Sequence, residues 1–349
     1  MKVIIFTMAF NAEKTVERTI DSILGQTFGN FEYYILDNGA TDHTGEIIQR
    51  YAAMDGRVKP IRLNKNDPTN GGALFSLLAT ASDADYIVWC DADDTYSPTF
   101  LEKMTAFAQE NNLDIAACGY DCIDGVSGEV VKHRALSENL IVAGDGFTEK
   151  FIQYRGFTSF LWGKLYALSA LRASKCLGTA PAHHVCTDTC GTLSFFAGAK
   201  RIGIYGEALY QYYQYPRSLS NTGVETILES YQILWRSTRA YLAGYGPISR
   251  LNMDFLYAIY LSLTDEAAGR IFSSELEAKK KLEMLGKLFH EPLWAETLAR
   301  EADPQFRNLA DREAYVQRMK ERILALADTA EEQRLAAETV RELDKPRAC

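Results

Sequence analysis

Three carboxylates stand together at the end of a short apolar run in the first third of the chain. The run Tyr86–Cys90 is followed by Asp91, Ala92, Asp93 and Asp94. Such a run is typical of a buried strand in a parallel sheet, and ligands of these sheets bind beyond the carboxyl ends of the strands. Neighbouring acids repel each other unless a cation holds them, and Mg²⁺ or Mn²⁺ takes carboxylate oxygens together with phosphates. The pattern predicts a metal–diphosphate site at Asp91, Asp93 and Asp94. The alternative is that Asp94 or Ser97 caps the helix expected from about Pro98.

Polar residues also follow the first two expected strands. Residues 7–11 follow a strand expected at 3–7, and the sequence Asp37-Asn38-Gly39 follows one expected at 31–36. A carboxylate such as Asp37 can accept a hydrogen bond from a base or a ribose hydroxyl, although Asp-Asn-Gly is also strong turn chemistry. The sequence contains no GxGxxG and no GxxxxGK[ST] motif. This absence argues against a Rossmann dinucleotide site and excludes a P-loop.

Strands and helices alternate over the first 90 residues. Further strands are expected at 58–63 and 86–90, and helices at 12–24, with Asn11 as the N-cap, 44–51 and 71–78. This alternation predicts an α/β fold with a mostly parallel central sheet and flanking helices. Later strands are expected at 115–120, 202–205 and 208–213, with a hairpin over 121–132. From about residue 224 the pattern becomes helical, so we expect one domain over 1–220 and a helical C-terminal region over 221–349.

Composition narrows the class of protein. The 349 residues include 47% hydrophobic ones, enough for a full core, and carry a net charge of −9 from 37 basic and 46 acidic side chains. An acidic chain is a poor match for nucleic acid. An odd number of cysteines, 7, without a regular framework favours reduced thiols and a cytoplasmic location. The N-terminus has no signal-peptide pattern, and no apolar run is long enough to predict a membrane span.

Taken in order, the motifs resemble family 2 glycosyltransferases of the GT-A fold. The resemblance is carried by Phe10–Lys14, Thr19–Phe28, Phe31–Asp42, Tyr86–Asp94, Trp162–Tyr166 and Leu209–Ser220, and covers about the first 220 residues. It implies the GT-A nucleotide-diphospho-sugar transferase fold and inverting, hexosyltransferase-type transfer from a nucleoside diphosphate sugar to an acceptor hydroxyl. A saccharide or a lipid-linked saccharide is the implied acceptor, in cell-surface polysaccharide or lipopolysaccharide synthesis.

The resemblance also assigns residues to roles. It implies Mn²⁺ or Mg²⁺ at Asp93 and Asp94, with Asp91 towards the donor, and a catalytic base in an acidic pair at the start of a helix. Asp188 matches the second member of that pair, whereas Thr187 stands where the family usually has Glu; the alternative is that Asp188 caps the helix. The donor-binding residues implied are Thr7, Phe10, Asn11, Asp37, Asn38, Gly39, Gly72, Asp91, Ala92 and Asp93. The acceptor-side candidates are Trp162, Lys164 and His184.

Two departures fall on the expected base pocket. The family usually has a second acid where this chain has Asn38, and an Arg after the Gly-Gly turn where this chain reads Gly71-Gly72-Ala73-Leu74. The resemblance therefore does not specify uridine. A non-catalytic binding module would also explain an altered pocket, but the retained acids oppose it. A sugar nucleotidyltransferase is opposed by the lack of a basic, glycine-rich N-terminal loop.

Two further interpretations concern other parts of the chain. His183, His184, Cys186 and Cys190 invite a zinc site, but their spacing is not that of a finger. Lys279–Lys281 beside Leu282 is a basic amphipathic segment in the C-terminal region. It leaves peripheral contact with the cytoplasmic membrane face and homodimerisation as alternative roles for the C-terminal helices.

Overall fold

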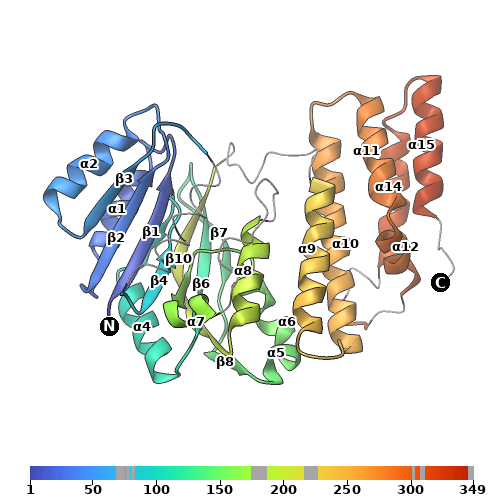
Figure 1. The fold of residues 1–349 in the computed structure, drawn as a ribbon. Coiled ribbons are helices and arrows are strands. Elements are labelled where there is room, and N and C mark those ends of the chain that lie inside the picture. Colours follow the sequence, from blue (N-terminus) through green and yellow to red (C-terminus); the bar gives the residue numbers. More distant parts are fainter. Residues whose placement is uncertain are drawn as a thin grey trace. The chain divides into compact units, whose positions relative to one another are not determined.

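The computed structural model describes residues 1–67, 75, 79, 83–173, 187–215, 227–300, 303–306 and 311–344. The chain divides into two compact units, and the main boundary falls between residues 221 and 222. The first unit is a mixed α/β domain and the second is helical (Figure 1). The expected α/β fold with a mostly parallel central sheet is confirmed.

The described part of the first unit contains a ten-stranded sheet with the order β3-β2-β1-β4-β9-β6-β10-β5, in which β7 pairs with β6 and β8 with β10. The strands are β1 Val3–Ala9, β2 Phe31–Asp37, β3 Val58–Arg62, β4 Tyr86–Trp89, β5 Thr95–Tyr96, β6 Ile115–Asp124, β7 Val130–Arg134, β8 Leu140–Ala143, β9 Lys164–Ala167 and β10 Arg201–Gln214. Strands β3, β2, β1 and β4 are parallel, as are β6 and β10, while β9 runs antiparallel between the two groups.

Helices flank this sheet. They are α1 Val16–Leu24, α2 Thr44–Met54, α4 Phe100–Glu110, α5 Gly146–Glu149, α6 Phe151–Tyr154, α7 Leu168–Ala173 and α8 Thr187–Gly198, with the 3₁₀ helix η1 at Arg155–Phe157. Helix α1 begins at Val16, not after Asn11, because Asn11 has a φ of 50° and its Oδ1 accepts from the Thr41 amide. Val3 to Phe6 are successive and all fully buried, which shows that both faces of β1 are covered.

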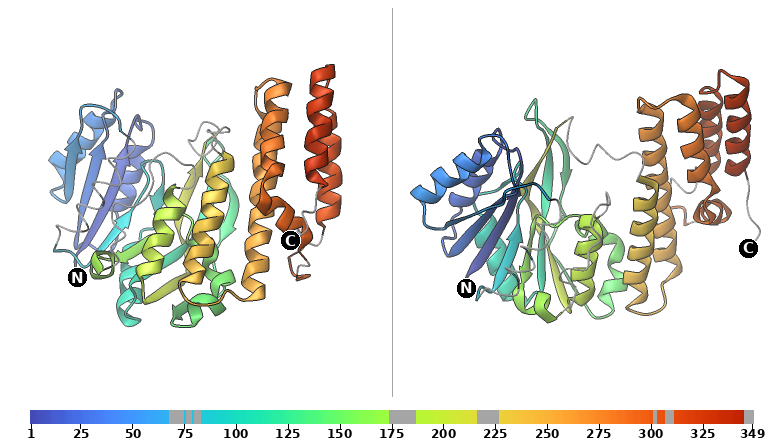
Figure 2. Two further views of the ribbon diagram at one scale, coloured as in Figure 1. Left: turned by 45° about the vertical axis from the view of Figure 1, so that its right-hand side comes forward. Right: turned by 45° about the horizontal axis from the view of Figure 1, so that its top comes forward.

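The strand register brings several carboxyl ends to one edge of the sheet. Ala9 at the end of β1 pairs with Asp37 of β2, and Phe6 pairs with Trp89 at the end of β4. Because β6 and β10 run in the same direction as β4, their carboxyl ends face the same edge. The N-terminus lies at the opposite edge, where β1 begins (Figure 2). The sheet therefore collects the predicted site segments at its carboxyl edge.

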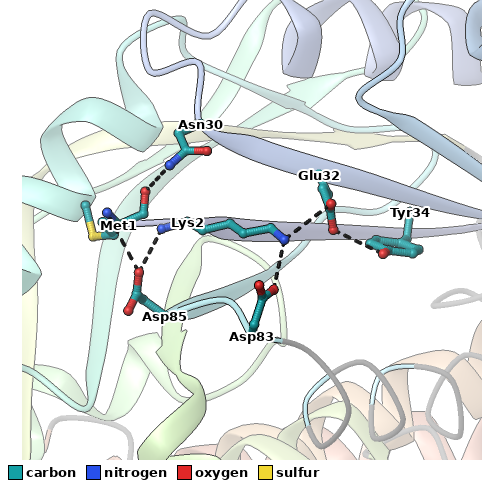
Figure 3. Close-up of polar contacts among 7 residues, drawn as sticks. All are labelled: Met1, Lys2, Asn30, Glu32, Tyr34, Asp83 and Asp85. Atoms are coloured by element: carbon teal, nitrogen blue, oxygen red, sulfur yellow. Dashed lines mark hydrogen bonds and ion pairs between the residues drawn. The ribbon is translucent and has the colours of Figure 1, made fainter.

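An ion network fastens the opposite edge, and Figure 3 shows its members. The Lys2 amide donates to Asp85 Oδ2 at 2.8 Å, and Lys2 Nζ lies 2.9 Å from Asp83 Oδ1 and 3.3 Å from Glu32 Oε1. Asn30 Nδ2 donates to the Met1 carbonyl at 2.6 Å. These contacts join the start of β1 to β2 and to the segment before β4.

The second unit consists of α9 Ile227–Ala243, α10 Arg250–Ser273, α11 Ala278–His290, α12 Pro292–Ala299, α14 Arg312–Leu324 and α15 Ala330–Leu343. Its core includes the fully buried Leu285, Trp294, Ile323 and Leu343. The expected helical C-terminal region is confirmed. None of the described helices is both long enough and apolar enough to cross a bilayer.

Candidate active site

The loop after β4, residues 91–94, is held by two successive residues of α1. Arg18 Nη2 donates to the Asp93 carbonyl at 2.5 Å, and Thr19 Oγ1 donates to the Asp94 carbonyl at 2.8 Å. Val16, Ile20 and Ile23 are buried on the same face of the helix as Thr19, because residues at this spacing form one helical face. The same helix thus packs on the core and fixes the backbone of the acidic loop.

Strand β10 holds the same loop through the side chain of Asp94. Asp94 is fully buried, and its Oδ2 accepts from the Tyr210 hydroxyl at 2.5 Å while its Oδ1 accepts from the Tyr213 amide at 2.8 Å. Burial, with added repulsion from Asp91 and Asp93, raises the pKa of Asp94 well above its usual value. Both oxygens are therefore occupied, and this geometry favours an anchoring role for Asp94 over the expected role of a metal ligand.

Asp91 and Asp93 are less buried than Asp94, and neither has hydrogen bonds from the described residues to both of its carboxylate oxygens. Asp91 is partly buried, and its Oδ1 accepts from the Trp89 indole at 2.7 Å. Burial raises its pKa to about 7, and Asp188 and Asp93 add to the rise. The carboxylate of Asp93 accepts no hydrogen bond from any other described residue; burial raises its pKa, while Arg18 acts to lower it. These two acids, rather than all three, remain open to a ligand.

Asp188, the predicted base, stands in the first turn of α8. Its side chain is exposed, yet protein atoms surround it densely enough that desolvation raises its pKa, while the charge of Lys164 acts to lower it. The charge of Asp188 in turn raises the pKa of Asp91. The start of α8 therefore lies near enough to the acidic loop for the charges of Asp188 and Asp91 to act on each other.

A divalent cation is compatible with the donor set of this site. Within the described ranges, no three His, Cys, Asp or Glu residues are grouped as a ready-made metal site. Ions such as Mg²⁺ at phosphates usually take only one or two protein carboxylates and complete their shell with phosphate oxygens and water. Asp91 and Asp93 offer hard oxygen donors whose raised pKa shows that their charges are poorly compensated. A cation bound together with a diphosphate fits these residues.

The expected base pocket is closed by Asn38. This residue is buried, and its Nδ2 donates to Asn66 Oδ1 at 2.9 Å and to the Asp67 carbonyl at 2.8 Å. Asp37 is also buried; its Oδ1 accepts from the Ala40 amide at 2.9 Å, and its Oδ2 lies 3.4 Å from Arg62 Nε. Asn38 thus fastens the segment at 66–67 and is not oriented towards a base. Asp37 holds the turn after β2 through Oδ1, while its buried Oδ2 accepts no hydrogen bond from the described residues.

The remaining donor-side residues occupy the same edge. Thr7 is fully buried and accepts from the Tyr33 hydroxyl at 3.0 Å, so it supports the strand end rather than lining the surface. Phe10 is 42% exposed and free to stack on a ligand. Ala92 is buried between the two open acids. Gly39 has a φ of +75°, and a Cβ there would lie 2.3 Å from the Lys65 carbonyl carbon, so only glycine fits.

The predicted acceptor-side residues Trp162 and Lys164 lie beneath the surface. The Trp162 ring stacks between Phe160, at 4.4 Å, and Tyr210, at 4.3 Å. Lys164 Nζ donates to the carbonyls of Phe160 at 2.5 Å and Trp162 at 3.0 Å, and burial lowers its pKa to about 7. Both residues are buried. They build the support under the site, and only Phe160 and Tyr212 of this aromatic stack are partly exposed.

Several predicted residues lie outside the described residues. These are Gly72, His184 and the other zinc candidates His183 and Cys186, as well as the Gly71-Gly72 helix. The fourth zinc candidate, Cys190, is described and is buried in α8. The sequence reasoning missed Arg18, Tyr210 and Tyr213 as parts of the site. The tyrosine-rich segment before residue 216 was the available signal, but nothing local assigns its partners.

Comparison with known proteins identifies relatives for this arrangement. Residues 4–170 match the family model Glycosyl transferase family 2. The uncharacterized glycosyltransferase EpsJ of Bacillus subtilis (strain 168) is 28% identical over 251 residues, which cover 70% of this chain and 71% of EpsJ. The uncharacterized glycosyltransferase YibD of Escherichia coli (strain K12) is 26% identical over 219 residues, which cover 60% of this chain and 61% of YibD.

Solved structures are similar over most of the chain. Residues 1–349 of S. aureus TarS in complex with UDP share 18% identity at a TM-score of 0.60, covering 93% of this chain and 91% of that one. The complex of the same TarS segment with UDP-GlcNAc shares 17% identity at a TM-score of 0.55, covering 98% and 89%. At this level of identity the likeness shows the fold.

Proposed function

Because the chain belongs to glycosyl transferase family 2 through residues 4–170 and has the GT-A fold, we propose that it is an inverting glycosyltransferase. It moves a hexosyl group from a nucleoside diphosphate sugar to an acceptor hydroxyl. The observation that carries this proposal is the placement of Asp91 and Asp93 in a loop after β4, at the carboxyl ends of the parallel strands, with Asp188 in the first turn of α8 near enough for its charge to act on Asp91. An acid pair from two separate elements at the carboxyl edge supplies both a donor site and a base.

The donor is a nucleotide sugar, which is supported by the TarS complexes with UDP and UDP-GlcNAc. Asp91 and Asp93 would hold Mn²⁺ or Mg²⁺ with the diphosphate, and Asp94 anchors the loop from which they project. When bound, the ion supplies positive charge that stabilises the departing diphosphate. Phe10, exposed at the end of β1, is placed to stack on the base. Asn38 fastens residues 66–67 instead, so we assign no particular base.

Asp188 acts on the acceptor side. The acceptor oxygen forms a bond to the anomeric carbon while the bond from that carbon to the diphosphate oxygen breaks, and its electron pair leaves with the diphosphate. The hydroxyl proton passes to the carboxylate of Asp188. A base works best when its pKa lies near the operating pH, and the raised pKa of Asp188 moves it in that direction. One displacement of this kind inverts the anomeric centre.

We place the reaction on the cytoplasmic side of cell-surface polysaccharide or lipopolysaccharide synthesis, with a saccharide or lipid-linked saccharide as acceptor. The basic segment of the second unit is engaged internally. Lys279 pairs with Glu331 at 2.8 Å, and Lys281 Nζ donates to the Phe272 carbonyl at 2.9 Å. This weakens the case for anionic lipid binding through Lys279 and Lys281, and a second copy of the chain is the alternative partner of the C-terminal helices. Liposome flotation together with light scattering distinguishes the two.

The experiment that tests the proposal measures hydrolysis of a panel of nucleotide sugars with and without Mn²⁺. Wild type is compared with Asp93→Ala and Asp188→Asn, and with Asp145→Ala as a control, because Asp145 is an exposed acid of the same unit without a side-chain cap bond. Metal-dependent turnover of one donor, lost in the first two variants and kept in the control, is the expected result. Pyrophosphate release from a nucleoside triphosphate would favour a nucleotidyltransferase. Failure of every donor to bind in calorimetry would overturn the transferase proposal and favour a binding module.

A further inference from the structure

Arg18 of α1 contacts both the acidic loop and β10, although it is not among the residues predicted for the site. Its guanidinium carbon lies 3.5 Å from the centroid of the Tyr213 ring, in the geometry of a cation–π contact. Its Nη2 donates to the Asp93 carbonyl at 2.5 Å and to the Tyr215 hydroxyl at 3.2 Å. One side chain therefore joins the first helix, the acidic loop and the end of β10.

The contacts of Arg18 are directional, so a positively charged side chain of a different shape cannot replace it. A planar guanidinium stacks on a ring and donates within its plane at the same time, whereas a lysine ammonium does not. No atom of the described residues accepts a hydrogen bond from the buried Nε of Arg18. An unsatisfied buried donor costs free energy. The hydrogen bonds of Arg18 are therefore incomplete and do not by themselves explain why an arginine is buried here. Its effect on the neighbouring loop at 91–94 explains it better.

The charge of Arg18 also acts where the acids are crowded. It opposes the desolvation that raises the pKa of Asp93. The backbone contact reaches the carbonyl of Asp93, the residue whose carboxylate is open to a ligand. Thr19 holds the next carbonyl, that of Asp94. Two adjacent residues of one helix thus bind the backbone of the loop, and of these two only Arg18 also contacts β10.

We propose that Arg18 is a positioning residue of the donor site, which sets the backbone of Asp93 so that its carboxylate meets a metal-bound nucleoside diphosphate. This inference rests on the proposed function. It assigns to Arg18 no contact with the substrate. Replacing the guanidinium should loosen the loop at 91–94 and weaken metal-dependent binding of the diphosphate.

The chain offers a matched control in Arg57. Its guanidinium carbon lies 4.6 Å from the centroid of the Phe31 ring, and its Nη2 donates to the Leu24 carbonyl at 3.2 Å. The combination of an aromatic contact with a bond to a carbonyl is the same as for Arg18. Phe31, however, is the first residue of β2 and lies at the opposite edge of the sheet. Arg57→Met also removes the ion pair of Arg57 with Asp55 at 2.7 Å, so it sets an upper limit on what the loss of such a contact does to stability away from the site.

The experiment compares Arg18→Met, Arg18→Lys, Tyr213→Leu and Arg57→Met with the wild type in two measurements. The first is amide hydrogen exchange of the peptide covering residues 91–97. The second is calorimetric binding of UDP and GDP with Mn²⁺ present. We expect faster exchange in the three site variants and a Kd raised about tenfold in Arg18→Met, the effect of losing a hydrogen bond to a charged group. Arg18→Lys should not restore the wild-type Kd, and Arg57→Met should change only the Tm.

The two measurements separate the possible failures. Unchanged exchange at 91–97 in Arg18→Met overturns the positioning role, whatever the nucleotide results. Faster exchange with an unchanged Kd also overturns it, because the loop would then not limit binding. If the wild type binds neither nucleotide while exchange responds as expected, the proposed donor chemistry fails and the contact of Arg18 with the loop stands.

Discussion

The carboxyl groups of Asp91 and Asp188 interact at the carboxyl edge of the sheet, and the charge of Asp188 is second only to burial in raising the pKa of Asp91 to about 7. The two acids come from the loop after β4 and from α8, which are far apart in the sequence. Their mutual repulsion is unfavourable in the protein without a bound cation. This cost makes the stability of the unliganded protein depend on pH.

The sign of that dependence follows from the raised pKa. The folded protein holds the Asp91 proton up to about pH 7, whereas an ordinary aspartate loses it near 3.8. The contribution of Asp91 to stability therefore falls as the pH rises between these values. We expect Asp91→Asn, which keeps an acceptor for Trp89, to raise the free energy of unfolding at pH 8 by about 2–4 kcal/mol and to have little effect near pH 4. Urea unfolding at both pH values measures this; an equal effect at both would contradict the coupling.

Replacement by alanine should lower stability at Asp94 and metal-dependent donor turnover at Asp93. Asp94→Ala leaves the Tyr210 hydroxyl and the Tyr213 amide without their acceptor, and should cost about 2–4 kcal/mol of stability. Asp93→Ala removes no side-chain hydrogen bond to another described residue, and should change stability by less than about 1 kcal/mol. Its loss of metal-dependent donor turnover should reach about a hundredfold or more, since charge stabilisation by a metal is worth several kcal/mol. Thermal unfolding and the hydrolysis assay, run on both variants, decide between anchor and ligand.

The strands that position the site could be predicted because β1 and β2 are rich in apolar and aromatic residues, while β3, which contains Lys59 and Arg62, carries a weaker signal of the same kind. The expected strands at 3–7, 31–36 and 58–63 are found as Val3–Ala9, Phe31–Asp37 and Val58–Arg62. Two strands were expected at 202–205 and 208–213, where the structure has the single strand β10. The register against β6 shifts between Tyr205 and Ala208. A bulge at that place interrupts the alternation of side chains, which explains the mistaken division.

The different roles of Asp91, Asp93 and Asp94 could not be predicted from their spacing. A DxDD pattern gives the same local chemistry to each carboxylate, but the fold surrounds Asp94 with Tyr210 and Tyr213 and leaves Asp93 open. These partners come from the far end of the first unit. In the same way, Lys164 was expected on the acceptor side of the site, whereas it is buried beneath it, where the carbonyls of Phe160 and Trp162 accept from its Nζ. Long-range contacts, absent from any local pattern, decided both outcomes.

Lys164 should set the acidic limit of activity. Its charge acts to lower the pKa of Asp188, because a nearby cation favours the carboxylate over the acid. Lys164→Met removes that charge, so the pKa of Asp188 should rise and activity should be lost at a higher pH as the solution is acidified. The pH profile of kcat measures the shift. Lys150→Met is the control, because Lys150 Nζ also donates to a backbone carbonyl, that of Ile141 at 3.0 Å. An unchanged pH profile of kcat in Lys164→Met would show that Lys164 does not influence the pKa of the base.

Asn38 offers the test of whether this chain could use the acid that its family usually has there. In Asn38→Asp, a carboxylate would face Asn66 Oδ1 and the Asp67 carbonyl, both of which now accept from the Asn38 amide. Because an ionised carboxylate cannot donate, we expect a loss of about 1–3 kcal/mol at pH 8 and a smaller loss near pH 4, where the protonated acid can donate one bond. Asn30→Asp is the matched control. Its amide also donates to a carbonyl, that of Met1 at 2.6 Å, but at an exposed site, so the cost should stay near zero. Urea unfolding of both variants at the two pH values gives the comparison. If Asn38→Asp were as stable as the control at pH 8, the amide would not be fastening residues 66–67, and the pocket beside Asp37 would be free to take a base.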